Sequence, residues 1–194
     1  MSIQYRDKDF AKSAPLLVLN EPRWPRPPRR IGLGHSVFAG ILAHCRMALR
    51  HARANEFPVA FISNGPRSGR WMAQLEPRNT DMLFERRAAS IYSCPYFRDA
   101  TQRMRKIVFA GFFRNGGCAA TLVDGLTAGH DLLFLRDAIE MSEEEQGFWF
   151  SMLSQPENAP QLAARAGTTT QWIAATGPHV RTDRPQIAEE RGET

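Results

Sequence analysis

A glycine-rich segment, residues 111–121, has the residue types and spacing best suited to chemistry in this chain. It reads Gly-Phe-Phe-Arg-Asn-Gly-Gly-Cys-Ala-Ala-Thr, follows the apolar run 107–110 and precedes a helical pattern. Glycines let a backbone pass close to a ligand, and the first turn of a helix offers unpaired N–H groups to an anion. A plain connection between a strand and a helix has the same composition, so the glycines alone leave both interpretations open.

The spacing within this segment resembles the nucleophile turn of the isochorismatase-like, or cysteine hydrolase, superfamily. In that family a strand and a glycine are followed by a dipeptide, three variable residues and a nucleophilic cysteine, and then by a threonine and an aspartate on the next helix. Gly111, Thr121 and Asp124 match this pattern, Gly117 occupies the nucleophile position, and Cys118 is one residue late. The Gly-Cys order resembles the true isochorismatases of the family, which cleave a vinyl ether and need no thiol.

Further segments resemble the same family in order and spacing, over roughly residues 14–176. Residues 16–20 resemble its first strand, 57–62 its second, 75–90 the segment with its lysine, and 137–142 the end of its fifth strand. The resemblance implies a Rossmann-like α/β fold, doubly wound, with a mostly parallel six-stranded sheet and helices on both faces. It also implies a homo-oligomer, a dimer or larger, because helices of this fold often pack across subunits.

The catalytic positions of the family are substituted in this chain. The family's aspartate, lysine and cysteine correspond here to Asn20, Arg86 and Gly117. An amide is neither an acid nor a base at neutral pH, and a guanidinium does not release its proton readily. True isochorismatase chemistry needs an acid that protonates a vinyl carbon, so we expect no vinyl ether cleavage by that route.

Other residues could replace the missing groups. Glu21 and Asp81 are candidate substitute acids, although strand alternation points Glu21 away from the side of Asn20 unless the chain turns immediately. Cys118 is a candidate shifted nucleophile, but a slip of one residue at a helix start turns a side chain by about 100°. We therefore expect a packed, inert thiol at Cys118. Asn20 itself is either a substrate-orienting amide or a bond to a neighbouring loop.

Several side chains are candidates for binding a ligand. Arg86 keeps a positive charge and gains bidentate geometry, which suits a carboxylate better than it suits proton transfer. The resemblance gives Phe112 and Phe113 as the dipeptide that lends an N–H to an oxyanion site. Aromatic residues near such an edge are as often plain core. The remaining candidates, polar or aromatic, are Trp24, Trp71, Tyr92, Arg114 and Asn115.

The formal net charge of +5 has one concentrated source, the run Arg-Trp-Pro-Arg-Pro-Pro-Arg-Arg at residues 23–30. Its prolines keep it extended, and it follows the first expected strand, at the sheet edge where open α/β folds bind ligands. The run is either a solvated loop or a positive collar that attracts a small anionic molecule. No nucleic-acid motif accompanies it, so we do not expect a nucleic-acid partner.

Length and composition indicate one soluble domain. The 194 residues, 43% of them hydrophobic, suffice for one core, which we place at 14–176 between an N-terminal extension, 1–13, and a polar tail, 177–194. No apolar run reaches about eighteen residues, so we expect no membrane span. Residues 1–10 lack an apolar signal region, and the three cysteines and five histidines show no metal-ligand spacing. We therefore expect a cytoplasmic protein with no metal and no cofactor.

The apolar periodicity predicts alternating strands and helices. Strands are expected at 15–20, 58–63, 82–85, 106–110, 131–136 and 167–174, and helices at 37–52, 95–104, 117–128 and from a capping box at 142–145 onward. Gly129 is expected to end the third helix in a left-handed conformation. The long loop at 64–80 could cover the site as a lid.

Two classes of function follow from the sequence. The first is a degenerate family member that binds a small anionic carboxylate, or that serves as a non-catalytic partner of an active enzyme. The second is a hydrolase of small amides or vinyl ethers that uses Glu21 or Asp81 as a substitute acid. Because Asn20, Arg86 and Gly117 replace the groups of the family mechanism, the sequence favours the first class.

Overall fold

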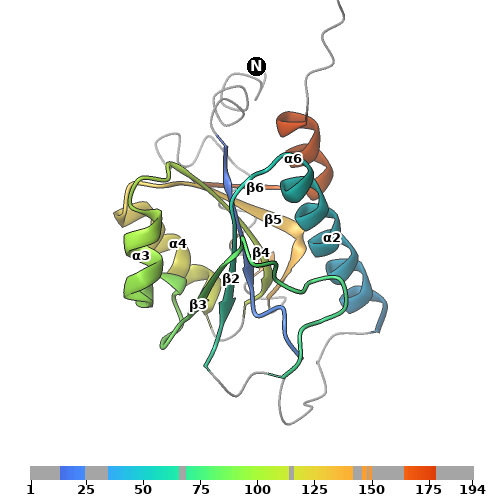
Figure 1. Cartoon of the computed structure of the whole chain (residues 1–194), viewed down its shortest axis with the longest axis horizontal. Helices are drawn as coiled ribbons and strands as arrows, with labels where there is room; N and C mark the ends of the chain where they lie inside the picture. The colour runs from blue at the N-terminus through green and yellow to red at the C-terminus, as the bar shows by residue number, and fades with distance from the viewer. Residues whose placement is uncertain are drawn as a thin grey trace, which may run out of the picture.

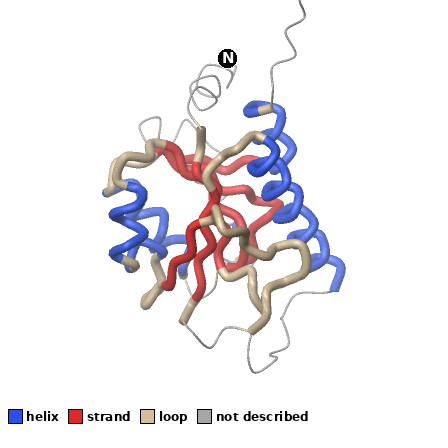
Figure 2. The backbone as a smooth tube through the Cα atoms, viewed as in Figure 1, coloured by secondary structure: helices blue, strands red, loops and turns tan. Residues whose placement is uncertain are grey.

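Six parallel strands form one sheet in the computed structural model of the chain, in the order β3-β2-β1-β4-β5-β6 (Figure 1, Figure 2). They are β1 (Leu16–Asn20), β2 (Val59–Ser63), β3 (Met82–Glu85), β4 (Lys106–Phe112), β5 (Asp131–Glu140) and β6 (Ala164–Gly167). The structure describes residues 14–24, 35–65, 69–113, 116–141, 146, 147, 149 and 164–177. The strand order reverses between β1 and β4, which is where open α/β sheets form a crevice for ligands.

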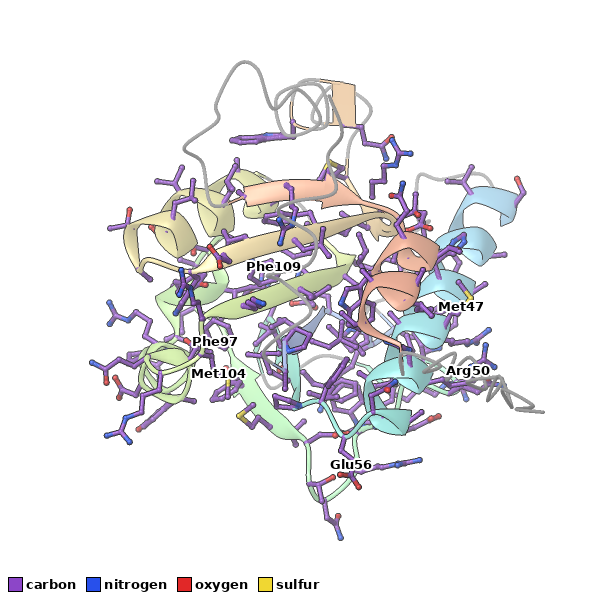
Figure 3. The ribbon with its side chains drawn as sticks, turned by 90° about the horizontal axis from the view of Figure 1, so that it is seen from above. Met47, Arg50, Glu56, Phe97, Met104 and Phe109 are labelled. Atoms are coloured by element: carbon purple, nitrogen blue, oxygen red, sulfur yellow. The ribbon has the colours of Figure 1, made fainter. Side chains whose placement is uncertain are left out.

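Helices cover both faces of the sheet. The helices α2 (His35–Ala54) and α6 (Thr169–Thr176) lie on one face, and η1 (Ile91–Ser93), α3 (Pro95–Thr101) and α4 (Gly117–Thr127) lie on the other (Figure 1). Figure 3 shows the same division from above, with Met47 and Arg50 of α2 on one side and Phe97 and Met104 on the other. The doubly wound α/β fold expected from the sequence is therefore confirmed, with every strand pair parallel. Among the described residues, none of the helices has both the length and the apolar character needed to cross a bilayer.

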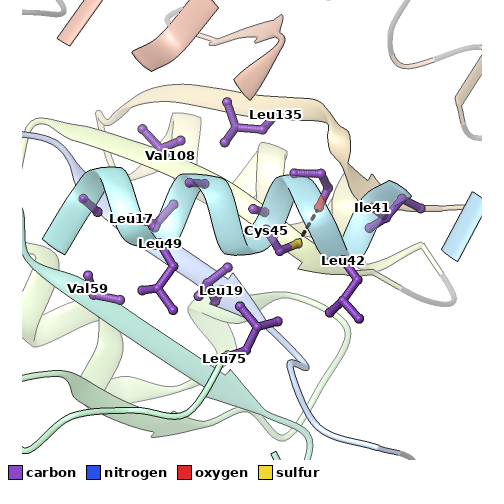
Figure 4. Close-up of a cluster of buried hydrophobic side chains, with 14 of the residues drawn as sticks. Leu17, Leu19, Ile41, Leu42, Cys45, Leu49, Val59, Leu75, Val108 and Leu135 are labelled. Atoms are coloured by element: carbon purple, nitrogen blue, oxygen red, sulfur yellow. Dashed lines mark hydrogen bonds between the residues drawn. The ribbon is translucent and has the colours of Figure 1, made fainter. Parts of the chain in front are cut away.

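Strand alternation divides the core into two layers. Leu17 and Leu19 of β1 pack beneath α2, whereas Leu16 packs on the face covered by α3 and α4. Figure 4 shows α2 lying over this first layer, with the Cys45 thiol donating to the carbonyl oxygen of Ala138 at 3.2 Å. Because helices cover both of its faces, β1 is buried along its whole length.

Most predicted elements occur, with shifts at their ends. β3 has the predicted bounds, and Gly129 follows α4 with a positive φ of 78°, as expected. β4 runs on to Phe112 and β5 to Glu140, beyond the predicted ends, because the two strands pair again after a register shift. α3 ends at Thr101 rather than at residue 104, and the Thr101 hydroxyl donates to a carbonyl one turn earlier.

The predicted strand at 167–174 is wrong: β6 ends where this segment begins, and the rest forms α6. Thr168 and Gln171 form a capping box in which each side chain accepts a hydrogen bond from the backbone N–H of the other. Asp137 of β5 accepts from both the N–H and the hydroxyl of Thr169. The threonine run has strand propensity, but capping and a carboxylate from another strand make it a helix start.

Gly111 is the position at which β4 comes closest to β1. The two strands pair there in the register Asn20↔Gly111. Gly111 has a φ of 110°, and a Cβ built on it would lie 2.2 Å from the carbonyl oxygen of Asn20. Strand pairing itself therefore requires the first glycine of the glycine-rich segment.

Gly111→Ala is expected to lower the free energy of unfolding by at least about 2 kcal/mol, because it adds an unfavourable φ and a backbone clash. Gly129→Ala is the matched control: its φ is also positive, but no atom lies within 4 Å of the added Cβ. There we expect a loss of about 1 kcal/mol. Urea denaturation measures both values, and equal losses would contradict the close approach at Gly111.

A buried pair, Tyr92 and His130, joins η1 to the start of β5. The Tyr92 hydroxyl lies 2.7 Å from His130 Nδ1, and His130 Nε2 lies 3.2 Å from the carbonyl oxygen of Thr101. A carbonyl only accepts, so Nε2 carries the proton and Nδ1 accepts from the tyrosine. Burial lowers the pKa of His130 and raises that of Tyr92, because each charged form would lose its hydration.

We expect the free energy of unfolding to fall as the pH is lowered below 6.5, the ordinary pKa of histidine. Burial lowers the folded-state pKa of both His130 and His51. The unfolded chain therefore takes up protons first, so this stability is fully present above the unfolded pKa and is lost as the pH falls. Urea unfolding between about pH 7.5 and pH 5 measures the slope. The variant His130→Gln should reduce the slope, and a stability that rises on acidification in this range would refute the assignment.

Candidate functional site

The candidate site lies at the carboxyl edge of the sheet, around the ends of β1 and β4. Asn20 ends β1, Arg86 follows the end of β3, and Gly117 begins α4. Because the strands are parallel, all three positions that match the family's catalytic set reach this same edge. Two of them lie close together, since a Cβ built on Gly117 would be 3.8 Å from Nη1 of Arg86.

Asn20 is completely buried and bonds to the neighbouring strand. Its Nδ2 donates to the carbonyl oxygen of Phe112 at 2.7 Å. Its Oδ1 is buried without a hydrogen-bond partner among the described residues. The amide therefore fixes the end of β4 and also leaves a buried acceptor. An ionised aspartate in the same place would hold its charge against a carbonyl oxygen, an arrangement that favours the neutral amide.

Glu21 turns back toward the site immediately after β1. Its φ is 52°, and its N–H donates to the carbonyl oxygen of Ile62 at 2.8 Å. Its Oε1 then lies 3.7 Å from Nη2 of Arg86, with the Glu21 side chain 20% exposed. The chain therefore turns immediately after β1, which is the condition under which the sequence allowed Glu21 to face the side of Asn20. A left-handed residue before a proline is unfavourable, so tertiary contacts hold Glu21 there.

Arg86 is a buried cation held by backbone carbonyls. Its Nη1 donates to the carbonyl oxygens of Ala88 at 3.0 Å and Ala89 at 2.7 Å. Its Nε is buried with no hydrogen-bond partner among the described residues. Burial lowers the pKa of the Arg86 guanidinium from its ordinary value, and the charge of Glu21 opposes that shift. The geometry therefore presents a carboxyl group beside a fixed guanidinium.

Backbone closes the space next to Gly117. A Cβ at this position would lie 3.1 Å from the carbonyl oxygen of Ala89, tighter than most real Cβ contacts. Arg86 fixes that same carbonyl. A cysteine at Gly117 would therefore need the segment after β3 to move by a few tenths of an ångström.

Cys118 points into the core. It is 4% exposed and belongs to the hydrophobic cluster on the α4 face, as the expectation of a packed thiol requires. Cys45 and Cys94 are also buried, and burial raises the pKa of Cys45 to about 12. A thiol of that pKa is not a thiolate at neutral pH.

Aromatic side chains form a row on the α2 side of the edge. The ring centroids of Trp24 and Phe38 are 5.7 Å apart, and those of Phe38 and Phe112 are 5.4 Å apart. Trp24 is partly exposed, whereas Phe112 and Phe113 are buried on opposite faces of the sheet. Phe38, which the sequence indicated only as a core residue of a helix, links the row.

The backbone N–H of Phe113 already donates a hydrogen bond within the sheet. It donates to the carbonyl oxygen of Glu140 at 2.9 Å, within the extra length of β4 and β5. An oxyanion site that depends on this N–H, as the resemblance implied, is therefore not open in this structure. The sequence did not indicate Glu140, because β5 was expected to end at residue 136.

Two predicted site residues lie elsewhere. Tyr92 is 3% exposed and reaches His130, which precedes β5, so it belongs to the core near the amino edge of the sheet. Asp81 precedes β3 and pairs with Arg53 of α2, also at the amino edge. Both placements correct the sequence interpretation, because strand direction separates these residues from the ends of β1 and β4. Arg114, Asn115 and residues 25–30, 66–68 and 142–145 lie outside the described residues.

The described part of the loop at 64–80 is tied down. Arg23 and Trp71 form an isolated antiparallel bridge, and the Arg23 guanidinium lies 3.8 Å from the centre of the Trp71 ring. Trp71 also packs edge-on against Phe61, with ring centroids 5.5 Å apart. Trp71 is therefore part of the wall beside β1 rather than of a free lid. Within the described parts of the chain, no three His, Cys, Asp or Glu side chains gather as metal ligands would.

Comparisons with solved structures give the same architecture. A cysteine hydrolase from Pseudomonas syringae pv. phaseolicola is 15% identical, with a TM-score of 0.67 over 84% of this chain and 92% of that chain. The N-carbamoylsarcosine amidase from Thermoplasma acidophilum is 15% identical, with a TM-score of 0.61 over 81% and 97%. The MAR1 ribonuclease from Caenorhabditis elegans is 17% identical, with a TM-score of 0.65 over 83% and 80%. At these identities the likeness concerns the fold alone.

Sequence comparison identifies the family. A family model described as the isochorismatase domain matches residues 29–165, which is most of the chain. Comparison with curated protein sequences gives no match. The parallel sheet, its strand order and the glycine-rich turn before α4 agree with that match. The chain belongs to the isochorismatase family.

Proposed function

We propose that this chain binds a small anionic molecule of the carboxylate class at the carboxyl edge and does not hydrolyse it by the family mechanism. The observation that carries this proposal is the burial and hydrogen bonding of the Arg86 guanidinium. Its guanidinium is buried and fixed by two carbonyls, yet its Nε has no acceptor among the described residues. A ligand carboxylate oxygen is an acceptor of the right charge for such a donor.

Asn20 supports the same proposal from the other side of the site. Its Oδ1 is a buried acceptor with no partner among the described residues. Buried polar atoms are rarely left unsatisfied, so a ligand or a bound water would supply the missing donor. A hydroxyl or amide N–H beside the carboxylate of the ligand fits this requirement.

Two features argue against the family mechanism. Asn20 is neutral, and its amide already donates to Phe112. The carbonyl oxygen of Ala89 would lie only 3.1 Å from the Cβ of any side chain at Gly117, which crowds that position. The general acid and the thiol nucleophile would therefore both be absent.

The alternative function is a hydrolase of small amides or vinyl ethers that uses Glu21 as its acid. One observation favours it: Glu21 lies 3.7 Å from Arg86, so an acid and a cation are neighbours as in the family's catalytic set. Asp81 has no such place, because it pairs with Arg53 at the opposite edge of the sheet.

Glu21→Gln separates the two functions. If the site binds carboxylates, removing a negative charge near Arg86 should tighten their binding by roughly tenfold. If Glu21 is a catalytic acid, the same change should abolish turnover instead. A thermal-shift series over small carboxylates, their amides and vinyl ethers, with product analysis of each hit, measures both effects.

Asp99→Asn is the matched control, because Asp99 is an exposed residue of α3 and lies on a segment distant from Glu21. It changes the net charge equally and should leave carboxylate binding unchanged. If every carboxylate fails to stabilise both the native chain and Glu21→Gln, the binding proposal fails. Turnover by the native chain that Glu21→Gln removes would establish the hydrolase.

Cysteine reactivity tests the absence of a thiol nucleophile. In the native protein we expect slow reaction of all three thiols with an aromatic disulfide reagent, because all are buried. Denaturation in urea should expose them to rapid reaction. Mass spectrometry assigns the modified residue, and fast native modification of Cys118 would restore it as a candidate nucleophile.

A further inference from the structure

One face of α2 carries three arginines at helical spacing. Arg46, Arg50 and Arg53 follow one another at intervals of four and three residues, so they lie on one stripe of the helix. No acidic residue occurs anywhere in α2. The stripe therefore has no intrahelical partner and must find its acceptors elsewhere.

The outer two arginines bind the chain segment that leads to β3. Arg46 Nε donates to the carbonyl oxygen of Ala73 at 2.9 Å, and Arg53 Nη2 donates to the carbonyl oxygen of Glu76 at 2.9 Å. These two bonds hold the segment along α2. Arg50 lies between them on the stripe and makes no such bond to the described residues of the segment.

The helix and this segment border an open hollow of about 290 Å³ at the amino edge of the sheet. Arg50 and Arg53 line it from the helix, and Gln74 and Arg78 line it from the segment. Figure 3 shows Arg50 projecting from α2 on the side of the molecule away from Phe97. The hollow is at the opposite edge from Asn20 and is a separate place.

Positive charge in the hollow exceeds the negative charge that faces it. The side chain of Asp81 is 5% exposed and already accepts from Arg53 Nη2 and from the N–H of Arg78. Within the described part of the chain, neither Arg50 nor the Arg78 guanidinium has a hydrogen bond or ion pair, and Arg53 Nε is buried without a partner. A helix end favours basic residues. That preference does not explain why Arg78, from another segment, faces the same hollow.

We propose that this hollow is a second anion site, and that its ligand is a small molecule bearing a phosphate monoester. Two unpartnered guanidinium groups call for about two negative charges, which a phosphate monoester carries at neutral pH. Guanidinium forks also match the geometry of phosphate oxygens, and the amide of Gln74 adds a donor. The site is independent of the carboxylate site, because the two lie at opposite edges of the sheet.

Methyl phosphate is the probe, and titration calorimetry of the full chain at constant ionic strength is the measurement. We expect saturable binding that weakens by about tenfold in Arg50→Gln and in Arg78→Gln, because each loses a charge-assisted contact. Arg98→Gln is the matched control. Arg98 is an exposed arginine of α3, on the other face of the sheet, and its loss should leave the affinity unchanged.

Dimethyl phosphate, with a single charge, should bind much more weakly than methyl phosphate. Equal binding of the two esters, equal weakening by Arg98→Gln, or no saturation would overturn the proposal. So would an RNA oligonucleotide that binds through Arg50 while methyl phosphate does not bind. Circular dichroism of each variant checks the fold. None of these outcomes depends on Glu21→Gln, so the two sites fail or succeed separately.

Discussion

The contact between the ends of β1 and β4 is the constraint on which the carboxyl edge depends. Gly111 allows the two backbones to approach so closely that any side chain at that position would meet the Asn20 carbonyl oxygen. The contact aligns the carboxyl end of β1 with that of β4, with Asn20 opposite Gly111. The Asn20 amide can then reach Phe112, and β4 can continue far enough for the N–H of Phe113 to bond with Glu140. If the two strands lay further apart, Asn20 could not bond to Phe112, and the polar groups at this edge would not be fixed relative to one another.

Arg86 organises the other half of the edge. Its Nη1 donates to the carbonyl oxygens of both Ala88 and Ala89 and so holds the two carbonyls together. The second of these carbonyls then occupies the space next to Gly117. Arginine at the lysine position and glycine at the cysteine position are therefore physically linked, because the fixed backbone leaves room for a glycine and little more.

Arginine plays different roles at the two edges of the sheet. At the carboxyl edge Arg86 is buried, and Glu21 lies beside it. At the amino edge Arg46 and Arg53 fasten the segment before β3 to α2, while Arg50 stays without a partner in the described part of the chain. The net charge of the whole chain does not distinguish an arginine that is bonded within the fold from one that has no partner. Local burial and the nearest acceptors decide what each cation does.

The sequence by itself determined the alternation of strands and helices from β1 to β5 and the chemical identity of Asn20, Arg86 and Gly117. Apolar periodicity reports burial along one segment, and that is enough to place most elements. Only the tertiary structure decided where the polar groups went. Glu21 faces the site because Arg86 and β2 stabilise a strained turn after β1. Thr169 starts a helix because Asp137 of another strand accepts its N–H. Tyr92 lies away from the site because its hydroxyl bonds to His130. A hydrogen bond depends on a partner that is distant in sequence, and no local pattern records that partner.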